Sequence, residues 1–311
     1  MIITVTFNPA IDKTAEVDTL HVGGLNRLCN VRMDAGGKGV NVSKTIQALG
    51  GKTLCTGFLA GNSGEYIQST LQDMQIESDF VWVEGATRTN LKVLDDQREL
   101  TELNEAGPYI QGEQIQALMD KILSLCDETT LVVLSGNVSP GVEKSIYRDM
   151  IYKIKEKKAS VILDADGELF KEGIQAHPMI IKPNKYELAL HFGMGKDFTN
   201  QDIIQKAKGL LNEETKLVVV SMGGEGSIFL SKDGVYQANA LSIQAHSSVG
   251  AGDAMVAAIA YASEQGYALE DLIRLAVATS AGAVMTEGTN PASKEVVENL
   301  MKQVQITKVE D

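Results

Sequence analysis

Four consecutive residues, Gly250-Ala251-Gly252-Asp253, have the composition of an anion-binding turn followed by a carboxylate. They lead into an Ala-, Met-, Val- and Ile-rich run that is typical of a buried helix. The first N–H groups of a helix lack intrahelical partners, and small residues let an anion approach them. Asp253 would stand beside that anion and take a proton from a hydroxyl as a phosphoryl group arrives. The alternative is an Asp that only caps the helix.

A second glycine-rich turn, Gly36-Gly37-Lys38-Gly39-Val40-Asn41, precedes another helical segment that runs to Leu49. Backbone N–H groups, the Lys38 ammonium and the Asn41 amide together suit a polyhydroxy or phosphorylated ligand. The nearby Gly51-Lys52-Thr53 resembles the end of a phosphate-binding P-loop, but Ile46 occupies the place of its first glycine. The sequence therefore indicates two glycine anion sites, neither of them a P-loop.

Asp12 lies at the end of Asn8-Pro9-Ala10-Ile11-Asp12, directly after a predicted first strand. Pro9 ends that strand and leaves Asp12 beyond its carboxyl end, where α/β proteins bind ligands. Asp12 is either an acceptor for sugar hydroxyls or a simple turn residue. Further along, Arg88 offers a planar fork for a phosphate, although an isolated Arg is often only a surface charge.

Polar and Gly-rich residues follow four later predicted strands in the same way. The carboxyl ends of parallel strands meet at one edge of a sheet, so these groups are expected to lie together. The segments are Ser135-Gly136-Asn137, Asp164-Ala165-Asp166-Gly167, Lys182-Pro183-Asn184-Lys185-Tyr186-Glu187 and Ser221-Met222-Gly223-Gly224-Glu225-Gly226-Ser227.

The regular alternation of strands and helices predicts an α/β fold with a doubly wound, mostly parallel sheet flanked by helices. Residues 10–35 and 86–106 are extended, and the second range contains an acidic hairpin turn, so we expect them to form a small β-sheet lid. Residues 1–9, 36–85 and 107–311 would form the α/β domain that binds nucleotide and substrate.

Composition narrows the classes of partner. A net charge of −13 over 311 residues argues against nucleic acid and against an anionic membrane surface. The three cysteines fit no metal-ligand spacing and indicate reduced thiols in the cytoplasm. No membrane span or signal peptide is expected, because no run of about 18 apolar residues occurs and the N-terminus is not basic.

No Cys–His or Ser–His pairing stands out, and no G-x-G-x-x-G follows the first strand, so hydrolase and dinucleotide chemistry are disfavoured. Phosphoryl transfer fits because it requires positioning, charge neutralisation and one base. At this point the sequence resembles the sugar kinases of the ribokinase/PfkB family, most closely their bacterial 1-phosphofructokinase branch. The resemblance covers nearly the whole chain and rests on the Asn8–Asp12, Gly36–Asn41 and Gly250–Asp253 motifs, the last with its preceding Ser-Ser-Val.

The resemblance implies an ATP-dependent kinase with a ribokinase-like fold, and it assigns roles to these residues. Asp253 would be the base, and the Gly250, Ala251 and Gly252 backbone the anion hole. Substrate would be bound by Asp12, Arg27, Gly36, Gly37, Lys38, Asn41, Arg88, Asn90 and Asn137, with Arg27 and Arg88 on its phosphate. ATP would contact Lys182, Asn184, Ser221, Gly223, Gly224, Gly226, Ser227 and Gly252, and Asn184 and Glu187 would organise Mg²⁺ through water.

The implied reaction converts ATP and fructose 1-phosphate into fructose 1,6-bisphosphate. Thr87-Arg88-Thr89-Asn90 and the segment Thr101–Pro108 resemble 1-phosphofructokinases more than tagatose-6-phosphate kinases, which usually carry Cys after an Asn in the first motif. Tagatose 6-phosphate and fructose 6-phosphate remain alternatives, as does a sugar-phosphate-binding regulator without catalysis. Apolar extended segments in the lid predict a homodimer formed through it.

Overall fold

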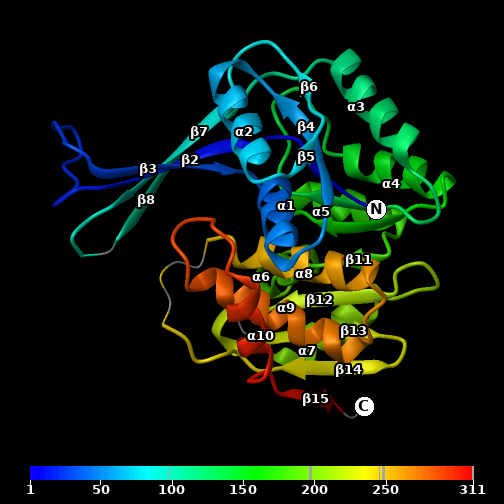
Figure 1. Ribbon diagram of the computed structural model, residues 1–311. Coiled ribbons are helices and arrows are strands. Elements are labelled where there is room, and N and C mark those ends of the chain that lie inside the picture. The colour runs from blue at the N-terminus through cyan, green and yellow to red at the C-terminus, as the bar shows by residue number, and fades with distance from the viewer. Residues whose placement is uncertain (98, 196–197, 245, 247–248, 310–311) are drawn as a thin grey trace.

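The computed structural model describes residues 1–97, 99–195, 198–244, 246 and 249–309. Its larger sheet has the strand order β15-β14-β13-β12-β11-β10-β9-β1-β4-β5, with β6 beside β4 (Figure 1). Pairing is parallel from β5 to β12 and antiparallel from β12 to β15. The strands are β1 Ile2–Thr6, β4 Thr53–Leu59, β5 Glu77–Ser78, β6 Val81–Trp82, β9 Leu131–Ser135, β10 Ser160–Asp164, β11 Ile180–Ile181, β12 Leu217–Ser221, β13 Ser227–Ser231, β14 Gly234–Ala238 and β15 Ile306–Val309.

Helices cover both faces of this sheet because its strands are apolar on both faces. Along β9, Val132 and Leu134 belong to one core, whereas Leu131 and Val133 belong to the other. The first core is closed by α3 Gly112–Leu125, α4 Ile146–Glu156, α5 Gly167–Gly173, α6 Lys185–His191 and α7 Asn200–Lys208. The second is closed by α1 Lys38–Leu49, α8 Ala251–Glu264, α9 Leu269–Val284 and α10 Lys294–Met301. The predicted mostly parallel α/β fold is confirmed.

A separate small sheet projects from the body (Figure 1). Its order is β3-β2-β7-β8, formed by Cys29–Gly36, Ala10–Glu16, Arg88–Leu94 and Leu100–Asn104. At its base it packs against α2 Gly61–Asp73, where Tyr66 donates a hydrogen bond to the Met33 carbonyl. The strands of this small sheet position several of the predicted substrate-binding residues.

The register divides the small sheet into two chemically different faces, since side chains alternate along each strand. Asp12 pairs with Asp34 on one side and with Asn90 on the other, so these three share a face. Arg32, Arg88, Lys92, Glu102 and Asn104 fall on the same face, which is polar. The opposite face is mostly apolar: besides Lys13, Thr89 and Thr101, it carries Ile11, Ala15, Val31, Met33, Ala35, Leu91, Val93 and Leu103.

The antiparallel edge of the large sheet was not anticipated from the sequence pattern. After β12 the chain turns through the 3-10 turn Gly223–Glu225, and β13, β14 and β15 follow as neighbouring antiparallel strands. In the part of the chain that the structure describes, no helix has the length and apolarity needed to cross a membrane.

Candidate active site

Asp253 lies in the first turn of α8, three residues after the Gly250 N-cap. Its side chain is buried, with 8% of the residue exposed, and Asn41 of α1 donates a hydrogen bond to its Oδ2 at 2.8 Å. Burial raises the pKa of Asp253 to about 6, although the nearby Lys38 ammonium and the Asn41 amide favour the ionised form. The result is a carboxylate able to accept a proton near neutral pH.

Two lysines converge on a second buried carboxylate, Asp164 at the end of β10. Lys38 Nζ lies 3.3 Å from Asp164 Oδ2, and Lys182 Nζ lies 3.1 Å from Oδ1. Burial disfavours the Asp164 anion, but the two ammonium groups outweigh it and lower its pKa, while Asp164 raises the pKa of Lys38. Two cations held by one anion leave a local excess of positive charge.

This charge lies at the amino end of α8. A Cβ built on Gly252 would be 3.5 Å from Lys182 Nζ, so the ammonium is close to the first turn of the helix. Helix N–H groups and two lysines therefore act together on the same space, as an anion-binding site requires.

The Asp253 and Asp164 groups face one cavity of about 620 Å³. It brings together nine of the predicted residues from four separate strand ends and turns. These are Lys38, Lys182, Asn184, Glu187, Ser221, Gly223, Gly224, Gly252 and Asp253, and the cavity is completed by Asp164, Lys185, Tyr186, Met222 and Glu225. The strand-end rule thus located most of this lining from sequence.

Asn184 and Glu187 form a capping box at the start of α6. Asn184 Oδ1 accepts hydrogen bonds from the Tyr186 and Glu187 backbones, and Glu187 Oε2 accepts one from the Asn184 backbone. Glu187 Oε1 accepts none from the residues that the structure describes, and burial raises the pKa of this carboxyl. Asn184 therefore orients Glu187, whose second oxygen remains available to a ligand.

The predicted glycines of residues 221–227 separate into two kinds. A side chain at Gly223 or Gly224 would meet nothing within 4 Å, and both line the cavity. A Cβ at Gly226 would lie 2.1 Å from the Ala238 carbonyl oxygen, so this glycine is required by the β13–β14 pairing. Gly226 and the buried Ser227 are not among the residues that line the cavity.

A second group of predicted residues lies on the polar face of the small sheet. Asp12 is 6% exposed, and its Oδ1 accepts a hydrogen bond from Asn90 Nδ2 at 3.1 Å. A Cβ on Gly36 would lie 2.7 Å from Asp12 Oδ2, so only glycine leaves room for this carboxylate. Gly36 ends β3 and Gly37 is the N-cap of α1, whose first turn carries Asn41 toward Asp253.

Asn41 and Asn90 share an unusual property. Each gives its amide nitrogen to a carboxylate, Asp253 and Asp12 respectively, and each leaves a buried Oδ1 without a partner in the described protein. Buried polar atoms are ordinarily hydrogen-bonded, so orphaned acceptors indicate a ligand that supplies donors. Two amide oxygens and two carboxylates suit a molecule rich in hydroxyl groups.

Arg88, Arg27 and Asn137 have different environments. The Arg88 guanidinium donates only to the Asn8 carbonyl, at 3.1 and 3.3 Å, and has no carboxylate within ion-pair distance among the described residues. Burial lowers its pKa, although Asp12 opposes this. Arg27 is exposed and lies beyond the end of the β2–β3 pair that is far from Asp12. Even Cys29, the first residue of β3, is five residues, or about 17 Å along a strand, from Asp34, the residue paired with Asp12. The structure does not bring Arg27 to the other residues.

Asn137 is exposed, and its Oδ1 accepts from the Val138 backbone and from Lys144 Nζ. Its oxygen is thus engaged within its own loop. Gly250 and Ala251 precede Asp253 as expected, whereas Ser247 and Ser248 of the Ser-Ser-Val segment lie outside the described residues. Asp164 was missed as a site residue, although its place at a strand end was the signal that could have found it.

Comparisons with known proteins agree with this geometry. The model of the pfkB family carbohydrate kinases matches residues 5–295. A 1-phosphofructokinase of Bacillus subtilis (strain 168) is 32% identical over 309 residues, covering 99% of this chain and 100% of the relative. A D-tagatose-1-phosphate kinase of Bacillus licheniformis is 32% identical with 99% of both chains covered. A tagatose-6-phosphate kinase of Staphylococcus epidermidis is 28% identical, covering 99% and 100%.

A solved structure of phosphofructokinase-2 from Escherichia coli, in complex with substrates and products, superposes with a TM-score of 0.92 at 25% identity, covering 97% of this chain and 98% of that one. Fold and relatives define an enzyme that transfers a phosphoryl group to an alcohol acceptor. The chain belongs to the pfkB family of carbohydrate kinases.

The desolvated Asp253 carboxylate should lower the stability of the folded protein at neutral pH. Its folded-state pKa of about 6 exceeds the ordinary value, so the folded state is penalised once pH rises above the unfolded pKa. Asp253→Asn removes the charge and should raise the free energy of unfolding at pH 7 by about 1–3 kcal/mol. Urea denaturation should show a smaller gain at pH 5, where the folded carboxyl is already protonated. A variant that is less stable than the wild type at pH 7 would contradict the conclusion that burial destabilises the ionised Asp253 carboxylate.

Proposed function

We propose that this enzyme phosphorylates fructose 1-phosphate at its 6-hydroxyl, using ATP and giving fructose 1,6-bisphosphate and ADP. The observation that carries the proposal is the placement of Asp253 in the cavity shared by Lys38, Lys182 and the start of α8. A base and an anion site at one point are what phosphoryl transfer to an alcohol requires.

In this mechanism Asp253 accepts the proton of the acceptor hydroxyl as its oxygen attacks the terminal phosphorus of ATP. The bond from that phosphorus to the bridging oxygen breaks, and ADP leaves with the electron pair. The N–H groups at Gly250–Gly252 stabilise the charge on the transferring oxygens, because they are preorganised at the helix start. Lys38 and Lys182, held apart from Asp253 by Asp164, add positive charge to the same space.

ATP occupies the side of the cavity formed by Asn184, Ser221, Gly223 and Gly224, where open space above two glycines admits the phosphates. Mg²⁺ bound with ATP supplies neutralisation of the phosphate charge. Glu187 is suited to bind that ion, because its Oε1 accepts no hydrogen bond from the described residues. Asn184 Oδ1 already accepts two backbone hydrogen bonds, so Asn184 would act on the ion indirectly, by orienting Glu187 and through water.

The sugar lies against the second group of residues. Asp12 and the orphaned oxygens of Asn41 and Asn90 accept hydrogen bonds from its hydroxyls, which explains why these acceptors are buried without protein partners. Arg88 binds the phosphate already on the substrate, because its guanidinium has no carboxylate partner among the described residues. In this proposal the small sheet acts as a lid over residues of the α/β domain, and residues 10–35 and 86–106 remain the proposed lid segments.

Fructose 1-phosphate is preferred because relatives named 1-phosphofructokinase from four bacteria are 28–32% identical over nearly the whole chain. The relatives named for tagatose 1-phosphate and tagatose 6-phosphate keep those ketohexose phosphates as alternatives. Coupled ADP-release assays on these sugars and on fructose 6-phosphate test the proposal directly. The highest kcat/KM is expected with fructose 1-phosphate, and a higher value for any other acceptor would replace it.

Asp253→Asn should retain binding of ATP and sugar phosphate but lower kcat by roughly 10²–10⁴. The wild-type kcat/KM for the sugar phosphate should fall as pH is lowered through about 6, because protonated Asp253 in the free enzyme cannot accept the hydroxyl proton. The kcat of the variant is measured at saturating substrates. Near wild-type turnover in the variant would exclude Asp253 as the base.

Arg88→Ala should raise KM for the sugar phosphate roughly tenfold or more while leaving KM for ATP close to wild type. Arg274→Ala is the matched control, since Arg274 lies on α9 with Val304 and Glu270 as partners. Equal increases in both KM values would remove Arg88 from the phosphate contact.

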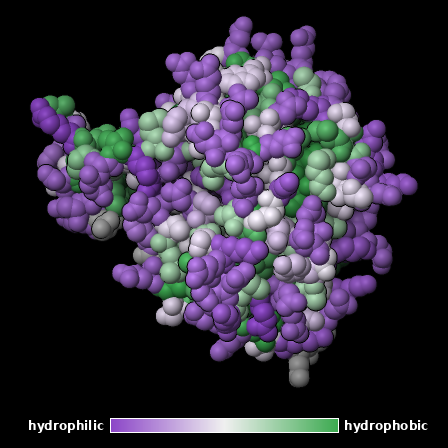
Figure 2. Space-filling view, viewed as in Figure 1, coloured by the Kyte–Doolittle hydropathy of each residue, from purple (hydrophilic) through white to green (hydrophobic). Residues whose placement is uncertain are grey.

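The lid also presents a surface for a second copy of the chain. Val31, Met33 and Leu103 lie on its apolar face and are 50, 42 and 59% exposed, and Figure 2 shows hydrophobic side chains gathered on the projecting part. We expect a homodimer through the lid. Light scattering at micromolar concentration should give twice the chain mass for the wild type. The double variant Met33→Asp, Leu103→Asp should give a lower mass. A monomeric wild type would contradict the proposed dimer.

A further inference from the structure

Strand β7 places three polar side chains in a row on the lid. Arg88, Asn90 and Lys92 alternate along the strand and therefore share its polar face with Asp12 of β2. Asn90 is directly paired with Asp12, and Lys92 lies two residue pairs further along, opposite Thr14. The row makes β7 the neighbour that determines the environment of Asp12.

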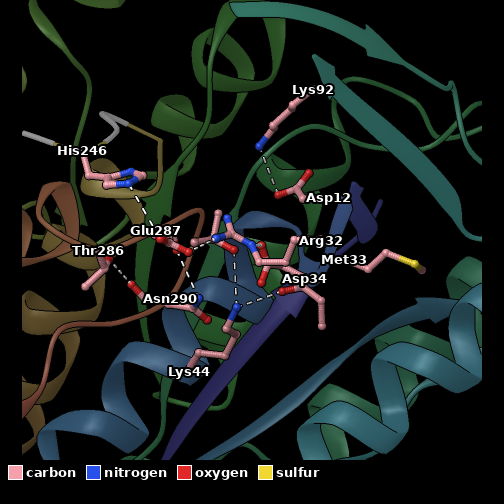
Figure 3. Close-up of polar contacts among 12 residues, drawn as sticks. Asp12, Arg32, Met33, Asp34, Lys44, Lys92, His246, Thr286, Glu287 and Asn290 are labelled. Carbon is pink, nitrogen blue, oxygen red and sulfur yellow. Dashed lines mark hydrogen bonds and ion pairs between the residues drawn. The ribbon is translucent and has the colours of Figure 1, made fainter. Parts of the chain in front are cut away.

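Both oxygens of Asp12 are held by this row. Asn90 Nδ2 lies 3.1 Å from Oδ1, and Lys92 Nζ lies 3.3 Å from Oδ2, the contact drawn in Figure 3. The absence of a side chain on Gly36 supplies the space in which the carboxylate lies. The rotamer of Asp12 is thus restricted by three neighbours at once.

Lys92 is 8% exposed, which is uncommon for a lysine and indicates that its ammonium group is paired with a carboxylate. In the described part of the chain, it is the cation within ion-pair distance of Asp12. Arg88 also interacts electrostatically with Asp12, but its guanidinium is directed to the Asn8 carbonyl. Without Lys92, the buried Asp12 carboxylate would lack its paired cation, and Arg88 would be the nearby group that could replace it.

We propose that Lys92 is a positioning residue for the sugar acceptor. It holds the Asp12 carboxylate oriented toward the sugar hydroxyls, and it keeps Arg88 available for the substrate phosphate. The inference rests on the proposed role of Asp12 and Arg88, and it adds a residue that acts through Asp12 rather than through ATP. Removing Lys92 should therefore affect the sugar substrate selectively.

The other charged cluster of the lid does not share this role. Arg32 pairs with Asp34 and with Glu287 of the turn after α9, and Figure 3 shows this cluster apart from the Lys92–Asp12 pair. Lys13 lies between Asp12 and Thr14 on β2, and its side chain is on the opposite face. Lys13→Met is therefore a matched control for Lys92→Met, with the same chemical change on the same sheet.

Steady-state kinetics of the full chain, with whichever ketohexose phosphate it turns over, test the proposal through a double-mutant cycle. Lys92→Met should raise KM for the sugar phosphate roughly 10- to 100-fold, with KM for ATP within about twofold of wild type. In an Asp12→Asn background, Lys92→Met should add less than about threefold, because the carboxylate it positions is gone. Lys13→Met should behave as wild type.

An unchanged sugar KM in Lys92→Met, equal rises in both KM values, or two effects that multiply in the double variant would overturn the proposal. If Lys92→Met yields too little folded protein, Lys92→Gln replaces it with the same expectations, since Gln also lacks the charge. An Asp12→Asn variant with a normal sugar KM would instead reject the proposed sugar contact itself. An impaired Asp12→Asn variant beside a normal Lys92→Met variant would reject only the role of Lys92.

Discussion

The burial of the Asp253 carboxylate is the constraint on which the rest of the site depends. A carboxylate removed from water resists ionisation unless donors and cations stand near it. Here Asn41 donates to one oxygen, and Lys38 contributes charge from across the cavity without pairing directly with Asp253. The balance leaves the pKa near neutrality, whereas a direct ion pair would have lowered it and weakened the base.

Asp164 makes that balance possible. It binds both Lys38 and Lys182 and thereby fixes two ammonium groups at the amino end of α8. A protein with a net charge of −13 thus places two lysine ammonium groups in one cavity, because the carboxyl edge of the sheet brings them together whatever the overall composition. The same strand ends that place these lysines also place Glu187 and the open glycine turn.

The small sheet is connected to this centre through buried contacts. Lys44 of α1 is 2% exposed, and its ammonium donates to the Ala35 carbonyl of β3 and to Thr289. Thr289 packs beside Gly250, and its turn also contains Glu287, the partner of Arg32 (Figure 3). The position of β3 is therefore linked to the turn next to the anion site, so lid and catalytic helix are parts of one packed network.

The sequence by itself determined the alternation of strands and helices that leads to β12, the glycine turns and the place of Asp253 at a helix start, because periodicity and turn chemistry are local properties. It also placed Asn184, Glu187 and Ser221 at one edge, since parallel strands end together. Only the tertiary structure decided which polar side chain contacts each carboxylate: Asp164 lies 126 residues from Lys38, and Asp12 lies 78 residues from Asn90. The tertiary structure also showed that Arg27 lies far from Arg88. It alone revealed the pairing of Lys92 with Asp12, because burial and pairing across strands depend on register rather than on residue type.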